Sequence, residues 1–132
     1  MKILRRFSSL KILKPGDEFK FKRTINQKEV EDFAILTGDT NPIHLTETPQ
    51  EKRLIHGSFL NSVVSGVIGT AFPGPGSIVL SQTFQFPNKC VVDEEIQILV
   101  KVLEARKIMK LSYECSQLDK IVFQGEAKIL RK

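Results

Sequence analysis

The fold is set by residues 57–72, which read GSFLNSVVSGVIGTAF. Large apolar side chains recur on nearly every side of the helix that this sequence favours, and small residues separate them. No charged residue occurs from Gly57 through Asn88. Such a helix is either buried or inserted in a membrane, and this one is too short and too polar to span a bilayer. We therefore expect a buried central helix, stopped by Pro73-Gly74-Pro75-Gly76.

Around this helix, apolar and polar residues alternate in the manner of strands with one buried face. One such strand precedes it, in residues 18–25. Four apolar sets follow it: Ile78, Leu80, Phe84 and Phe86; Ile96, Ile98, Val100 and Val102; Leu111, Tyr113 and Cys115; Ile121, Phe123, Ala127 and Ile129. One-sided strands bury a central helix when their sheet curls round it. The sequence predicts a single α+β domain over residues 15–132, an antiparallel sheet wrapped around a long helix.

A second, amphipathic helix is expected over residues 27–37. Asn26 and Glu29 form a capping-box pattern at its start, and Gly38 supplies a left-handed C-cap. The chain therefore leaves this helix at Asp39. The polar residues 45–54 that follow the next turn are expected to form a loop or a single helical turn.

Asp39 and His44 are five positions apart, with Asn41 and Pro42 between them. A tight turn can bring this carboxylate and imidazole to one water molecule, and such a pair can remove a proton from water and return one. Asn41 can hold the pair in place by hydrogen bonding. The same residues also make a good turn without any catalytic role, because Asp caps such turns and Pro stiffens them. The residues alone leave both interpretations open.

His56 and Gly57 stand where the central helix begins. Free N–H groups at a helix N-terminus stabilise a developing negative oxygen, and glycine lets a carbonyl approach the backbone. The alternative is that Gly57 only eases packing, and that Ser65 only bonds to the preceding turn. Asp39, His44 and His56 match no familiar ligand spacing, so neither a metal site nor a cofactor is predicted.

The charge distribution argues against a nucleic-acid partner. The net charge is +5, but residues 1–14 contain five basic residues and no acidic one, so the remainder is about neutral. This leader fits a mitochondrial transit peptide, and Arg5-Arg6-Phe7-Ser8 resembles a matrix-processing site; a plain basic tail fits equally well. If residues 1–14 are not a targeting signal, a cytoplasmic location is expected. Cys90 and Cys115 form no zinc or disulfide pattern and are expected to be buried thiols.

Residues 33–44, FAILTGDTNPIH, resemble the motif of the MaoC-like, R-specific enoyl-CoA hydratases, in which an aromatic residue precedes Gly-Asp-x-Asn-Pro-aliphatic-His. Ile55-His56-Gly57 is similar to the family's Val/Ile-His-Gly at the start of its central helix. Ser65-Gly66, residues 73–77 and Leu80-Ser81-Gln82 also resemble the family. The likeness extends over most of the chain from about Lys14 and includes the mitochondrial 3-hydroxyacyl-thioester dehydratases of type 2.

The resemblance implies a hot-dog fold and a homodimer with its sites near the interface. It implies that Asp39 and His44 activate water, that the Gly57 N–H polarises a thioester carbonyl, and that Ser65 lies near the site. Asn41 and His56 join Gly57 among the expected oxyanion and substrate-binding residues. The implied reaction interconverts (3R)-3-hydroxyacyl and trans-2-enoyl thioesters of CoA or acyl carrier protein, in mitochondrial fatty-acid synthesis.

One departure from the family concerns the segment between His44 and His56, which is several residues shorter than usual. Gln50 also stands where the family has a small residue. Because this segment is expected near the acyl pocket, chain-length preference is not predicted. Hot-dog domains also carry out thioester hydrolysis, so an acyl thioesterase and a non-catalytic acyl-binding module are alternative functions.

Overall fold

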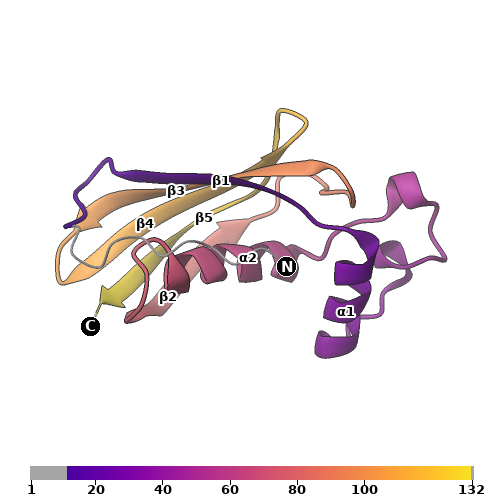
Figure 1. The fold of residues 1–132 in the computed structure, drawn as a ribbon, viewed down its shortest axis with the longest axis horizontal. Coiled ribbons are helices and arrows are strands. Elements are labelled where there is room, and N and C mark those ends of the chain that lie inside the picture. The colour runs from indigo at the N-terminus through magenta and orange to yellow at the C-terminus, as the bar shows by residue number, and fades with distance from the viewer. Residues whose placement is uncertain (1–11, 132) are drawn as a thin grey trace.

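The computed structural model describes residues 12–131 (Figure 1). Five strands and two long helices build it, with two short 3-10 turns between the helices. In chain order they are β1 (Glu18–Thr24), α1 (Gln27–Thr37), η1 (Pro42–His44), η2 (Gln50–Lys52), α2 (Gly57–Thr70), β2 (Ser77–Gln85), β3 (Glu95–Ala105), β4 (Ile108–Gln117) and β5 (Lys120–Arg131). Most of the predicted leader, residues 1–11, lies outside the described residues. Leu13 at its end is packed in the core.

The five strands form one antiparallel sheet in the order β1-β3-β4-β5-β2. Figure 1 shows α2 lying along one face of this sheet and α1 projecting beyond one end. The predicted alternation is confirmed in β3 and β4, whose buried residues meet the buried side of α2. Val64 and Val67 on α2 and Val100 and Leu111 on the sheet are all fully buried. The predicted α+β arrangement is therefore confirmed.

The ends of α1 are those that the sequence predicts. Asn26 Oδ1 accepts from the Glu29 N–H at 2.9 Å, and Glu29 Oε1 accepts from the Asn26 N–H at 3.1 Å. Gly38 ends the helix in the left-handed conformation, with φ of 80°, and its N–H donates to the Ala34 carbonyl. Arg23 at the end of β1 pairs with Glu29 at 2.7 Å. These contacts fix the direction in which the chain enters the turn after α1.

Two expectations about burial are wrong for the single chain. The sequence predicts a buried central helix that the sheet covers on most sides, yet one face of α2, with Ser58, Ser62, Ser65 and Gly69, is exposed. The apolar set in residues 78–86 is also expected to be buried, yet Ile78, Leu80, Phe84 and Phe86 are 42–50% exposed.

The position of β2 explains the second difference. It is an edge strand with a neighbour on one side only, and a bulge between Val79 and Ser81 interrupts its alternation. A five-stranded sheet does not reach far enough round α2 to cover the remaining face. Within residues 12–131, no helix is both long and apolar enough to cross a membrane.

Candidate active site

The turn between α1 and η1 is organised by its own polar side chains. Asp39 Oδ1 accepts from the Asn41 N–H at 3.2 Å, and Asn41 Oδ1 accepts from the Ile43 N–H at 3.3 Å. Asn41 thereby caps η1, which begins at Pro42. The Thr37 hydroxyl donates to the Phe33 carbonyl and accepts from the Asp39 N–H. The side chain of Asn41 is thus engaged within the turn, while the second oxygen of Asp39 faces away from it.

His44 is held from several sides and is only 6% exposed. Its carbonyl accepts from Gln27 Nε2 at 3.0 Å, and its ring Nδ1 lies 2.7 Å from the Leu54 carbonyl oxygen. Because a carbonyl only accepts hydrogen bonds, Nδ1 must carry the ring proton in the neutral imidazole. The other ring nitrogen, Nε2, is then left with a free lone pair.

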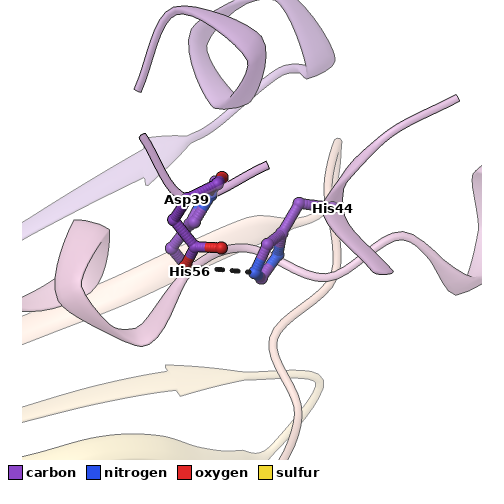
Figure 2. A group of neighbouring side chains, drawn as sticks. All are labelled: Asp39, His44 and His56. Atoms are coloured by element: carbon purple, nitrogen blue, oxygen red, sulfur yellow. Dashed lines mark hydrogen bonds and ion pairs between the residues drawn. The ribbon is translucent and has the colours of Figure 1, made fainter. Parts of the chain in front are cut away.

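Figure 2 shows the ring of His44 beside the carboxylate of Asp39. The distance from His44 Nε2 to Asp39 Oδ2 is 3.9 Å, too long for a direct hydrogen bond. One water molecule about 2.8 Å from each atom fits this gap. It would donate both protons, one to each acceptor, and leave its own lone pairs directed outward. The Asp39 side chain is 49% exposed and that of His44 is 8% exposed, so solvent borders the gap on the Asp39 side.

His56 lies beneath this pair and is 1% exposed. Its Nε2 is 3.1 Å from the Asp39 carbonyl oxygen, and its ring stacks on that of His44 at 3.7 Å and 22°. Nε2 must be the protonated nitrogen, and Nδ1 is buried with no hydrogen-bond partner among residues 12–131. Burial lowers the pKa of His56, because desolvation disfavours the imidazolium. His56 was expected among the substrate-binding residues, but its ring faces the protein interior.

The N-terminus of α2 follows His56 directly. The helix has no side-chain cap, and the first N–H groups bonded within it are those of Phe59 and Leu60, to the His56 carbonyl. The N–H groups of Gly57 and Ser58 have no acceptor among residues 12–131. The Phe86 ring packs on Gly57 so closely that an added Cβ would lie 2.7 Å from it. Two amides without an acceptor among residues 12–131 therefore lie directly after the residue that contacts both Asp39 and His44.

Ser65 is on the exposed face of α2, two turns after Gly57. Its hydroxyl makes no hydrogen bond to the described part of the chain, whereas Ser62 donates to the Ser58 carbonyl. Ser65 is therefore free to contact a molecule lying along α2.

Asp39, His44 and His56 each offer a donor atom within 4.8 Å of the others, which raises the question of a metal ion. The lone pair of an imidazole nitrogen lies in the ring plane, and ligand distances to zinc are about 2.0–2.1 Å. The two rings are stacked 3.7 Å apart at 22°, so their lone pairs do not converge on one point at that distance. The arrangement suits hydrogen bonding of one water better than ligation of an ion.

Three contributors to the site carry no signal in the sequence. Gln27 reads only as the first residue of a helix, the Leu54 carbonyl is part of the backbone, and Phe86 lies 29 positions after Gly57. Their roles depend on how the chain returns to the site after residues 45–54 and after β2.

Comparison with known proteins places these features in context. The family model described as "MaoC like domain" matches residues 11–122. A 3-hydroxybutyryl-CoA dehydratase of Methylorubrum extorquens is 37% identical over 116 residues, covering 82% of this chain and 74% of that protein. A mitochondrial 3-hydroxyacyl-[acyl-carrier-protein] dehydratase of Arabidopsis thaliana is 29% identical, covering 95% of this chain and 83% of that protein. An (R)-hydratase of A. caviae involved in PHA biosynthesis superposes with a TM-score of 0.84 at 30% identity, covering 91% of this chain and 98% of that one.

Proposed function

The chain belongs to the MaoC-like domain family, and from this premise we propose that it interconverts (3R)-3-hydroxyacyl thioesters and trans-2-enoyl thioesters. It is a hydro-lyase, since the relatives that cover most of it are dehydratases and hydratases. The observation that supports the residue assignment is the Asp39–His44 pair, separated by 3.9 Å, together with the Gly57 N–H, which has no acceptor among residues 12–131.

In the hydration direction, Asp39 and His44 orient one water molecule and His44 Nε2 accepts one of its protons. The remaining hydroxide oxygen forms a bond to the β-carbon of the enoyl group. The electron pair of the Cα–Cβ double bond moves to the thioester carbonyl and gives an enolate-like oxygen. The α-carbon then takes a proton from the pair, so that one water is added across the double bond.

The negative charge that develops on the carbonyl oxygen needs donors, and the Gly57 N–H is the proposed one. Removing a single donor of this kind costs about 10²–10³-fold in rate in other enzymes. The positive end of the α2 dipole acts at the same point. Ser65, exposed further along α2, is proposed to contact the acyl thioester.

We propose that two copies associate through β2. Among residues 12–131 this strand has an unpaired edge, and its exposed Leu80 and Phe84 belong to an apolar surface that a monomer rarely leaves uncovered. The mass in solution, measured by sedimentation, should be that of a dimer. A Leu80→Lys variant should sediment as a monomer.

The acyl carrier and the compartment are further parts of this proposal. The basic leader in residues 1–14 and the mitochondrial Arabidopsis relative support a mitochondrial location and an acyl-carrier-protein substrate in fatty-acid synthesis. The Methylorubrum relative named for a CoA thioester supports the other carrier. Fusing the leader to a fluorescent reporter tests the location, and comparing the two thioesters of one acyl group tests the carrier.

The function itself is tested by following loss of enoyl absorbance with trans-2-enoyl-CoA substrates of increasing chain length. The wild type should hydrate at least one of them to the (3R) product, and Asp39→Asn should reduce the rate by about 10²–10⁴-fold. Release of free CoA thiol together with the enoic acid, in place of a (3R)-3-hydroxyacyl-CoA product, would instead identify a thioesterase. Tight binding without turnover would identify an acyl-binding module. Either result would refute the proposed reaction.

A further inference from the structure

We propose that His56 is a positioning residue, which sets the geometry between the water-activating pair and the carbonyl-binding amide of Gly57. The inference rests on the proposed function and deepens it. His56 does not reach substrate, since it is 1% exposed, and it acts through the three groups that it contacts.

The first contact holds Asp39. Within residues 12–131 the carboxylate accepts one hydrogen bond, at Oδ1 from the Asn41 N–H at 3.2 Å, and the Asp39 side chain is 49% exposed. The backbone of the same residue is fixed from below, because its carbonyl accepts from His56 Nε2 at 3.1 Å. The other hydrogen bonds of Asp39 are to Thr37 and Asn41 in the same turn, so this bond joins the turn to the residue that precedes α2.

The second contact holds the ring of His44. The two imidazoles are stacked at 3.7 Å, and Phe33 packs against the other side of His56 with its ring centroid 4.9 Å away. The Leu54 carbonyl fixes one point on the His44 ring, and the stack fixes the plane in which its Nε2 lone pair lies.

The third contact is through the backbone of His56, which is the N-cap of α2. Its carbonyl accepts from the N–H groups of Phe59 and Leu60 at 3.0 and 3.3 Å. The next residue is Gly57. One residue therefore joins the turn with Asp39, the ring of His44 and the first amide of the helix, so that the water and the carbonyl oxygen are held at a fixed separation.

The role requires a neutral His56, and its surroundings favour that form. A proton on Nδ1 would be buried without an acceptor among the described residues. The titratable groups that act on it are His44 and Asp39, and burial, the largest effect, lowers the pKa of His56. His44 can therefore accept a proton from water without a like charge on the stacked ring.

Two substitutions separate the contacts. His56→Phe keeps an aromatic ring in the stack and removes the N–H that Asp39 needs. His56→Gln keeps an N–H donor at about the position of Nε2 and removes the ring. We expect His56→Phe to lower kcat by about 10²-fold with a small change in KM, the scale of a displacement of about 1 Å in a catalytic group. We expect His56→Gln to retain more activity than His56→Phe.

A double-mutant cycle distinguishes positioning from a general loss of structure. If His56 acts through the pair, His56→Phe should cause almost no further loss in an Asp39→Asn background. His56→Phe should also shift the acid side of the pH profile of kcat/KM. The matched control is Met109→Ala, which leaves a cavity in the core at the start of β4. It should lower the free energy of unfolding and leave kcat and the acid side of the pH profile of kcat/KM unchanged.

The possible results separate the inference from the function on which it rests. Wild-type kcat in folded His56→Phe, or the same loss in both backgrounds, would overturn the role of His56. The proposed function would still stand if Asp39→Asn lowers the rate as expected. If His56→Phe does not fold, the test uses His56→Gln instead. A kcat of His56→Gln lower than that of Asp39→Asn would also overturn the positioning role of His56. Wild-type activity in Asp39→Asn would refute the proposed function itself.

Discussion

Replacing Gly57 by alanine is the perturbation that the structure describes most closely. The backbone at Gly57 is not in the left-handed region, so the alanine backbone itself is unstrained. Its Cβ, however, would lie 2.7 Å from Cε1 and 2.8 Å from Cζ of Phe86. Carbon atoms in ordinary contact are about 3.5–4.0 Å apart, so the Phe86 ring must move by about 1 Å.

The expected change in stability is small because two effects oppose each other. Overpacking costs about 1–3 kcal/mol, and the half-exposed Phe86 ring can move outward, which favours the lower end of that range. Alanine in place of glycine in a helix contributes up to about 1 kcal/mol in the opposite direction. Gly57→Ala should therefore unfold in urea with a free energy between the wild-type value and about 2 kcal/mol below it.

The expected change in activity is large, because the new methyl group and the displaced ring occupy the space beside the Gly57 N–H. A shift of about 1 Å in a reacting group can cost about 10²-fold, and we expect a loss of that size in kcat/KM with an enoyl-CoA substrate. Gly66→Ala is the matched control on the same helix, since its Cβ would meet nothing within 4 Å. It should gain up to about 1 kcal/mol of stability with unchanged kcat/KM. Wild-type kcat/KM in Gly57→Ala would refute the assignment of this amide.

Three further predictions concern the rest of the molecule. Burial lowers the pKa of His56 in the folded protein, so on acidification the imidazole takes up a proton at a higher pH in the unfolded state than in the folded state. The stability that a neutral His56 contributes is therefore complete above pH 6.5 and is lost as the pH falls below it. Between about pH 7.5 and about pH 5, the free energy of unfolding in urea should fall less for His56→Gln than for the wild type. Burial raises the pKa of Cys90 and Cys115 to about 12, so both thiols should react with a thiol reagent at neutral pH only as the protein unfolds, and rapid labelling of native protein would contradict this. Asn26→Ala should lower the free energy of unfolding by about 1 kcal/mol, because the Glu29 N–H loses its cap; an unchanged midpoint in urea would show that the cap is dispensable.

The parts of the fold that sequence predicts well are those governed by local interactions. The capping box of Asn26 and Glu29 and the left-handed Gly38 involve residues at most four positions apart, and both bounds of α1 agree with the prediction. The alternation in β3 and β4 is equally local, since neighbouring side chains must point to opposite faces.

The differences arise where the answer depends on distant parts of the chain. Alternation in residues 77–85 identifies an apolar face, but it cannot show that β2 is an edge strand whose face the protomer leaves exposed. Spacing brings Asp39 and His44 together in one turn, but not His56, whose stack on His44 depends on the path of residues 45–54. The resemblance of the motif to MaoC-like hydratases indicated the catalytic pair, while the support beneath it is visible only in three dimensions.

The central claim is that Asp39 and His44 act together on one water molecule, and a double-mutant cycle on enoyl-CoA hydration tests it directly. Asp39→Asn and His44→Gln should each lower kcat/KM by about 10²–10⁴-fold, and the double variant should be no slower than the slower single one, because either change removes the same oriented water. Full activity in either single variant, or losses that multiply in the double variant, would show that the two residues do not share that water.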